Sequence, residues 1–299
     1  MIYDCVLFND ELDLLELRLS YMYNEVDFFV IAESAITHSN QPKKLFYFNN
    51  KDRFKPYQDK IIYIEIPPVE QKDSWEGEFY QRNYLKTGLK DCTGDDLIII
   101  ADIDEIVNVE YLKLSHSITQ PVILDTPMYY YFFNLKTNVR WQKVLLTPYK
   151  FIKEFDIGNR INYKHLNPKT VKGDSYELGW HFSYMFGYDI NLYKSKLVSF
   201  SHQEYNSAYY LNDKRINACV KLGVDFLERY SIYYPVKLSK EIPAALLTAI
   251  SKVYNLKNVV YKKPGIAFYL DPVNLKYFLK LVVKLKLAIL RARLMPPQQ

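Results

Sequence analysis

Three carboxylates directly follow a short apolar run near residue 100. Residues 97–101 read Leu-Ile-Ile-Ile-Ala, and Asp102, Asp104 and Glu105 come next. Side chains two positions apart on a strand point the same way, so Asp102 and Asp104 can converge on one cation, whereas Glu105 points to the opposite side and should matter less. Hard divalent ions favour oxygen ligands and substrate phosphates. The spacing therefore predicts a Mg²⁺ or Mn²⁺ site, and the competing interpretation is a solvated acidic loop.

Two polar residues lie on the helix predicted before these acids, Arg82 and Asn83. A buried arginine can hold a diphosphate through two parallel hydrogen bonds. Taken alone, Arg82 fits a solvated charge on a surface helix better. We keep both residues as candidates for contact with a diphosphate.

Two histidines follow aromatic or strand-like sequence, His181 in "GWHFS" and His202 in "SFSHQEY". A neutral imidazole on either one could complete a metal site with the two aspartates. The alternative for each is a histidine that packs in the core.

Apolar runs predict the sheet that must position these residues. Residues 28–33, 61–66 and 97–101 read as buried strands, as does the start of the chain, and capping residues predict helices from Asn9 and from Asp73. This order predicts an α/β fold with a mostly parallel sheet and helices on its faces. Ligands of such sheets bind beyond the carboxyl ends of the strands, where Glu33 and the two aspartates also lie.

The second half of the chain has a different texture. Short aromatic or β-branched runs predict strands up to residue 149, residues 157–176 look like loop, and residues 179–187 and 196–206 again look strand-like. A helical region is expected over about 207–230. We expect one domain over 1–235 and a helical region over 236–299.

Composition and cysteine content exclude several classes of protein. The chain has 299 residues, of which 49% are hydrophobic and 24% charged, a globular balance that argues against disorder. Its three cysteines form no paired motif, which predicts neither a disulfide framework nor a zinc cluster. No secretory signal, membrane-spanning run or nucleic-acid-binding motif is recognisable. From these features we expect a cytoplasmic protein that does not bind nucleic acid.

The net charge of +5 comes from the end of the chain, because residues 273–299 hold six basic residues and no acidic one. Apolar residues in this segment recur near helical spacing, and Lys276, Lys280 and Lys284 form a row four residues apart. This pattern predicts a basic amphipathic helix that contacts the inner face of an anionic membrane. Packing of the same helix on the protein body is the alternative.

Six blocks resemble glycosyltransferase family 17 in their order along the chain. They cover roughly residues 1–230 and read "IYDCVLFNDELDLLELRL", "FFVIAESAITHSNQPK", "WEGEFYQRN", "DLIIIADIDEI", "GWHFSYM" and "SFSHQEY". The resemblance implies a GT-A-like fold, a divalent cation and an inverting transfer of a sugar, most simply N-acetylglucosamine (GlcNAc), from a UDP-sugar. The acceptor would be a glycan or a lipid-linked glycan.

The resemblance also implies roles for individual residues. Glu33 would lie beside the nucleoside, Asp102 would assist at the ribose, and Asp104 would hold the cation. A distant histidine at a strand end commonly completes such sites, which favours His202 over His181 as the third ligand.

Inversion needs a general base on the far side of the sugar. The candidates are Glu204, which adjoins the expected strand end, then Asp189 and Glu177. Trp180 and Trp141 could stack on a sugar ring, although core packing is the simpler role for each. Two other functions stay open here, a metal-dependent phosphohydrolase and a non-catalytic glycan-binding relative.

Overall fold

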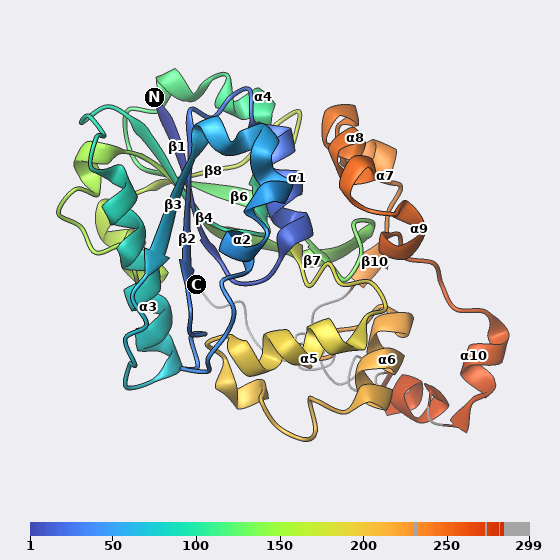
Figure 1. Cartoon of the computed structure of the whole chain (residues 1–299). Coiled ribbons are helices and arrows are strands. Elements are labelled where there is room, and N and C mark those ends of the chain that lie inside the picture. Colours follow the sequence, from blue (N-terminus) through green and yellow to red (C-terminus); the bar gives the residue numbers. More distant parts are fainter. Residues whose placement is uncertain (230–232, 273, 281, 284–299) are drawn as a thin grey trace, which may run out of the picture.

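One mixed sheet organises the part of the chain that the computed structural model describes, residues 1–229, 233–272, 274–280 and 282–283. Its first half is parallel and has the order β3-β2-β1-β4 (Figure 1). These strands are β1 (Ile2–Phe8), β2 (Phe28–Ser34), β3 (Ile61–Ile66) and β4 (Leu97–Asp102). The strands predicted from the apolar runs, and their parallel arrangement, are thus confirmed.

The second half of the sheet continues from β4 through an antiparallel strand. The order is β4-β7-β6-β9-β5, and two short strands pair at its sides, β8 with β6 and β10 with β7. These strands are β5 (Glu105–Val107), β6 (Val122–Tyr130), β7 (Leu135–Pro148), β8 (Lys169–Val171), β9 (Gly179–Ser183) and β10 (Tyr233–Pro235).

Helices cover both faces of the sheet. The α-helices are α1 (Leu12–Met22), α2 (Phe46–Asn49), α3 (Ser74–Tyr84), α4 (Val109–Leu112), α5 (Ile190–Ser199), α6 (Asp213–Leu222), α7 (Leu238–Glu241), α8 (Ala244–Val253), α9 (Leu256–Val259) and α10 (Ile266–Leu270). The 3-10 helices are η1 (Lys51–Lys60), η2 (Leu85–Leu89), η3 (Ser115–Ser117), η4 (Tyr149–Phe151), η5 (Arg160–Leu166) and η6 (Gln203–Tyr205). Asp73 caps α3 by accepting hydrogen bonds from the backbone N–H groups of Trp75 and Glu76, a cap that stabilises a helix by about 1 kcal/mol.

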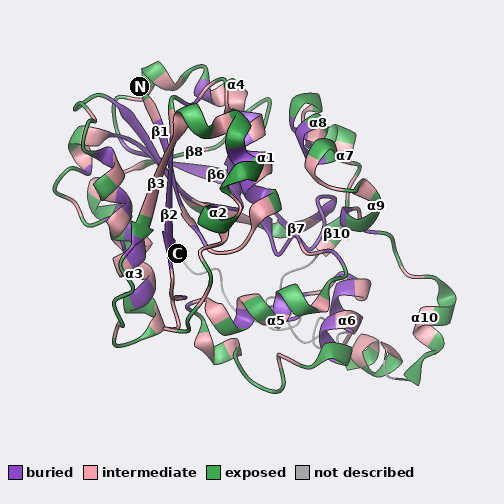
Figure 2. Cartoon of the chain, viewed as in Figure 1, coloured by how far each residue is buried: buried purple, intermediate pink, exposed green. Residues whose placement is uncertain are grey.

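Alternation along the parallel strands divides the core between two faces. In β1, Val6 and Phe8 join the core cluster that includes α1, whereas Tyr3 and Cys5 join the cluster that includes Leu85 of η2. The central strands are buried on both sides, as Figure 2 shows, which explains why they read as continuous apolar runs.

The α/β class, the mixed sheet and the flanking helices are therefore confirmed. Two local predictions are wrong. Residues 196–206 are not a strand: their first four residues end helix α5, which Asp189 caps and whose Tyr193 and Leu197 face the core at helical spacing, and Gln203–Tyr205 form η6. Part of the expected loop is ordered too, since Arg160–Leu166 form η5.

The described residues after 235 include helices α7 to α10 and share a core with the sheet. Leu246 and Ile250 of α8 belong to the same buried cluster as Leu15 of α1. Most of the predicted basic helix over 273–299 lies outside the described residues. None of the helices described in the structure is long and apolar enough to cross a membrane.

Candidate functional site

The acidic segment turns sharply at the carboxyl end of β4. The strand ends at Asp102, Ile103 and Asp104 form a turn, and β5 begins at Glu105. Fully buried Arg18 holds this turn, because its Nη1 donates to the carbonyl oxygens of Asp102 (3.2 Å) and Glu105 (2.7 Å). The expectation that both aspartates project from one extended strand is therefore wrong.

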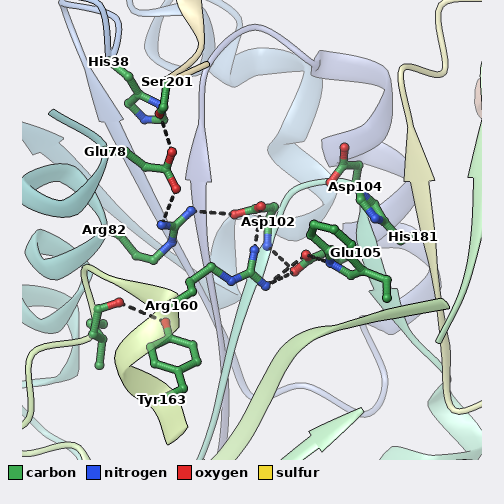
Figure 3. Close-up of polar contacts among 12 residues, drawn as sticks. His38, Glu78, Arg82, Asp102, Asp104, Glu105, Arg160, Tyr163, His181 and Ser201 are labelled. Atoms are coloured by element: carbon green, nitrogen blue, oxygen red, sulfur yellow. Dashed lines mark hydrogen bonds and ion pairs between the residues drawn. The ribbon is translucent and has the colours of Figure 1, made fainter. Parts of the chain in front are cut away.

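Asp102 lies between two buried guanidinium groups. Arg82 Nη2 donates to Oδ1 at 2.9 Å, and Arg160 Nη1 donates to Oδ2 at 2.7 Å (Figure 3). Burial alone would raise the pKa of Asp102, but Arg160 and Arg82 outweigh it and hold this pKa well below the usual range. Both carboxylate oxygens accept short hydrogen bonds from guanidinium groups, so a cation could bind Asp102 directly only by displacing one of them.

A chain of polar contacts holds the guanidinium of Arg82 in addition to its contact with Asp102. Glu78 Oε1 accepts from Arg82 Nη1 at 2.6 Å, and Ser201 donates to the other oxygen of Glu78. The Ser201 hydroxyl also lies 3.3 Å from His38 Nδ1 (Figure 3). Burial lowers the pKa of His38, which favours the neutral imidazole. These contacts fix the guanidinium of Arg82 relative to the end of β4.

Glu105 lies in the same network, on the other side of Arg160. Its side chain is fully buried and accepts from Arg160 Nη2 at 2.7 and 2.9 Å, from Trp141 Nε1 and from the backbone N–H of Asp102. The turn at 103–104 breaks the strand alternation from which Glu105 was expected to point away from the aspartates. That Glu105 matters less for transfer stays a prediction.

Asp104 faces a separate set of side chains. Its Oδ1 lies 3.4 Å from His181 Nε2, and its Oδ2 lies 3.6 Å from Lys196 Nζ on α5. Burial would raise the pKa of Asp104, but His181 and Lys196 lower it below its usual value. The imidazole of His181 also packs on Trp141, with ring centroids 4.6 Å apart.

Asp104 and His181 fit a divalent cation better than Asp102 does, because the contacts of Asp104 are longer than the hydrogen bonds that hold Asp102. Both side chains are buried, and His181 Nδ1 has no hydrogen-bond partner among the described residues. A carboxylate and an imidazole are suitable donors for Mn²⁺ or Mg²⁺ when a diphosphate supplies further oxygens. Within the described ranges, no group of three or more acidic, histidine or cysteine side chains is arranged to hold a metal. The protein therefore offers part of a coordination shell.

Further charged groups gather where β1 ends beside β4. Glu11 Oε1 lies 3.6 Å from Lys196 Nζ, and Lys43 Nζ donates to the carbonyl oxygen of Asn9 at 3.0 Å. Burial, together with the carboxylate of Glu11, raises the pKa of Asp10 to about 6. Carboxylates crowd this edge of the sheet, which favours the binding of a cation.

Comparison with known proteins identifies the family. Residues 1–242 match the model of glycosyltransferase family 17. The chain belongs to glycosyltransferase family 17. Over 125 residues it is 32% identical to proteins of Homo sapiens and Rattus norvegicus and 31% identical to one of Mus musculus, each named beta-1,4-mannosyl-glycoprotein 4-beta-N-acetylglucosaminyltransferase. These matches cover 38% of this chain and 24%, 23% and 23% of the relatives, so the chain matches about a quarter of their length.

Solved structures with some likeness to this chain are distant. HddC from Yersinia pseudotuberculosis is 10% identical, with a TM-score of 0.35 over 62% of this chain and 91% of that one. The inositol-1-phosphate CTP transferase from T. maritima is 9% identical, with a TM-score of 0.35 over 87% and 98% of the two chains.

Two candidates for donor binding are buried in this chain and need correction. Glu33 is 0% exposed, and its carboxylate already accepts from Tyr63 Oη and from the backbone N–H groups of Tyr47 and Phe48. Trp180 is 1% exposed and packs edge-on against Tyr21. Neither side chain has a free face for a nucleoside or a sugar, because each completes the core.

Asn83 stays exposed on α3, and its Oδ1 accepts from the backbone N–H of Ile157 at 3.3 Å. It therefore helps to hold the segment that carries Arg160. The other tryptophan, Trp141, is partly exposed and lies between Glu105 and His181. Trp141 is thus the tryptophan that borders the site.

The remaining candidates have other partners in the described structure. His202 is half exposed and pairs with Glu204 at 2.7 Å, beside the ring of Trp75. Glu177 is bound by Arg140 at 2.7 Å, and exposed Asp189 caps α5. The structure thus brings His181, and not the favoured His202, next to Asp104. The base roles of Glu204 and Asp189 stay predictions.

Sequence reasoning missed Arg160 and Lys196. Arg160 sits in a segment without periodicity, so no local signal marks it as buried. Lys196 could have been found from the capped helix beginning at Ile190, since that register places it one position before buried Leu197.

Asp10 makes stability depend on pH. Its pKa of about 6 in the folded state exceeds the value of about 3.9 expected for an unfolded chain, so the folded state binds more protons between these values. Stability is therefore lost as the pH rises through this window. Asp10→Asn should raise the free energy of unfolding by about 1–2 kcal/mol at pH 8 and by much less at pH 4.5.

Urea unfolding at the two pH values measures this difference. Exposed Asp174→Asn is the control and should change stability little at either pH. An equal gain from Asp10→Asn at both pH values would contradict the assignment.

Proposed function

We propose that this family 17 glycosyltransferase transfers GlcNAc from a UDP-sugar to a glycan or lipid-linked glycan, with inversion at the anomeric carbon. Membership of the family supports the reaction class, and the names of the mammalian relatives support GlcNAc. The observation that carries the proposal is the pair of Asp104 and His181 at the carboxyl end of β4, beside the buried arginines that hold Asp102.

Sugar transfer leaves a nucleoside diphosphate, whose negative charge must be neutralised as the glycosidic bond breaks. A divalent cation would supply this neutralisation, and Asp104 and His181 are the residues that would hold it. Arg82 and Arg160 keep Asp102 ionised and fixed, and their contacts set the shape of the turn that carries Asp104. Arg18 holds the same turn from the opposite side.

The acceptor hydroxyl needs a base on the side of the sugar away from the diphosphate. Glu204 and Asp189 are both exposed, and neither forms an ion pair with an arginine in the described structure. Each carboxylate is therefore accessible to an acceptor sugar. We keep them as the proposed bases in that order.

A screen of UDP-sugars tests the proposal. UDP-GlcNAc with Mn²⁺ should raise the melting temperature more than UDP-glucose or UDP-galactose does, because ligand binding stabilises the folded state. It should also yield UDP in the presence of a mannose-containing glycan. Phosphate release without an acceptor would instead support a phosphohydrolase, and glycan binding without any response to UDP-sugars would support a non-catalytic relative.

A further inference from the structure

Lys196 reaches the site from α5, and its ammonium lies between two carboxylates that follow the ends of different strands. Its Nζ is 3.6 Å from Asp104 Oδ2, which follows β4, and 3.6 Å from Glu11 Oε1, which follows β1. Its ammonium also lies over the ring of Tyr184, 5.1 Å from the centroid. The lysine is therefore held in place by charges and by an aromatic face together.

The ammonium stays charged in this position. A lysine ammonium is ordinarily charged at neutral pH, and two carboxylates lie 3.6 Å from this one. Its side chain is only 23% exposed, so solvent screens the attraction less than at an open surface.

We propose that Lys196 is a built-in competitor of the divalent cation, occupying the carboxylate of Asp104 until the cation displaces it. The inference rests on the proposed function, because it assumes that Asp104 holds the cation. One oxygen of Asp104 faces His181 and the other faces Lys196. A cation that binds Asp104 and His181 together must weaken the contact with Lys196, since two positive groups repel at this range.

The competition has a consequence for the order of binding. A cation that binds without a nucleotide forms a bond to Asp104, but it deprives the ammonium of Lys196 of one of its two carboxylate partners. A diphosphate that arrives with the cation offers the ammonium new oxygen partners. Lys196 should therefore make the cation and the nucleotide bind cooperatively, and binding of the cation alone should be weak.

Calorimetric titration of the full chain with Mn²⁺, without nucleotide, tests this directly. Lys196→Met keeps the apolar stem over Tyr184 and removes the charge, so it should bind Mn²⁺ about tenfold more tightly than the wild type. Lys196→Arg keeps the charge and should bind as weakly as the wild type. Lys194→Met, on the same helix but paired with Asp213, should leave the affinity unchanged.

A second titration, with UDP present, measures cooperativity. UDP should raise the Mn²⁺ affinity of the wild type. The ratio of Mn²⁺ affinities with and without UDP should be several-fold smaller for Lys196→Met. If Lys196→Met fails to fold, Lys196→Gln provides the same two readouts with a side chain that can still donate to Asp104. Wild-type Mn²⁺ affinity in the neutral variants would overturn the inference.

Asp104→Asn separates this failure from failure of the proposed function. If Asp104→Asn loses Mn²⁺ binding while Lys196→Met binds like the wild type, the cation site stands and the competition is refuted. If Asp104→Asn binds Mn²⁺ like the wild type, the proposed cation site itself is refuted and the competition with it.

Discussion

Glu105→Gln is expected to lower the free energy of unfolding by about 3–5 kcal/mol, because removing one partner leaves buried charges uncompensated. Glu105 is fully buried and holds Arg160 through both carboxylate oxygens. With the neutral amide, Asp102 would be the remaining carboxylate partner of Arg160 in the described structure. The NH₂ group of the amide would also face groups that now donate hydrogen bonds to Glu105, and these donors would lose an acceptor. Urea unfolding of the apo protein measures the effect.

Glu110→Gln is the matched control for this experiment. Glu110 is exposed and pairs with Lys113 at 2.8 Å, a type of surface contact that contributes about 0.2–1 kcal/mol. If both glutamine variants change stability equally, the buried network around Asp102 does not contribute as described.

Asp104→Asn should abolish metal-dependent sugar transfer, with a loss of about 10³-fold or more, and should leave the protein folded. The substitution keeps the shape of the side chain but removes the charge that would hold a cation. Its effect on stability should be small beside that of Glu105→Gln, since the contacts of Asp104 with His181 and Lys196 are 3.4 and 3.6 Å long. Transfer rates over a range of Mn²⁺ concentrations, with circular dichroism as the check on folding, measure both effects.

The two histidines are compared in the same assay. His181→Ala should raise the Mn²⁺ concentration needed for half-maximal activity, whereas His202→Ala should leave it close to that of the wild type. This expectation reverses the order favoured by the sequence, since the structure places His181 beside Asp104. Full activity of Asp104→Asn in the presence of a chelator would refute the metal site as a whole.

Local patterns in the sequence were sufficient for the framework of the site. The apolar run 97–101 and the acids after it predict a strand that ends in carboxylates, and the structure has β4 ending at Asp102. The cap at Asp73 and the strand at 61–66 are likewise encoded by neighbouring residues, so α3 and β3 could be predicted. The wrong strand prediction at 196–206 has the same origin, because "KLVSF" was interpreted without the cap and the apolar positions that precede it.

The sequence by itself determined the α/β class, the parallel half of the sheet, the family resemblance and the end of β4 as the place of the site. Only the tertiary structure decided which charges meet there. Arg160 is 58 residues from Asp102 in the chain, and it reaches that carboxylate across the ordered segment η5. Lys196 reaches Asp104 only because α5 is a helix that lies beyond the carboxyl ends of the parallel strands (Figure 1). Strand periodicity depends on adjacent residues, whereas pairing between buried charges depends on long-range packing that no local pattern records.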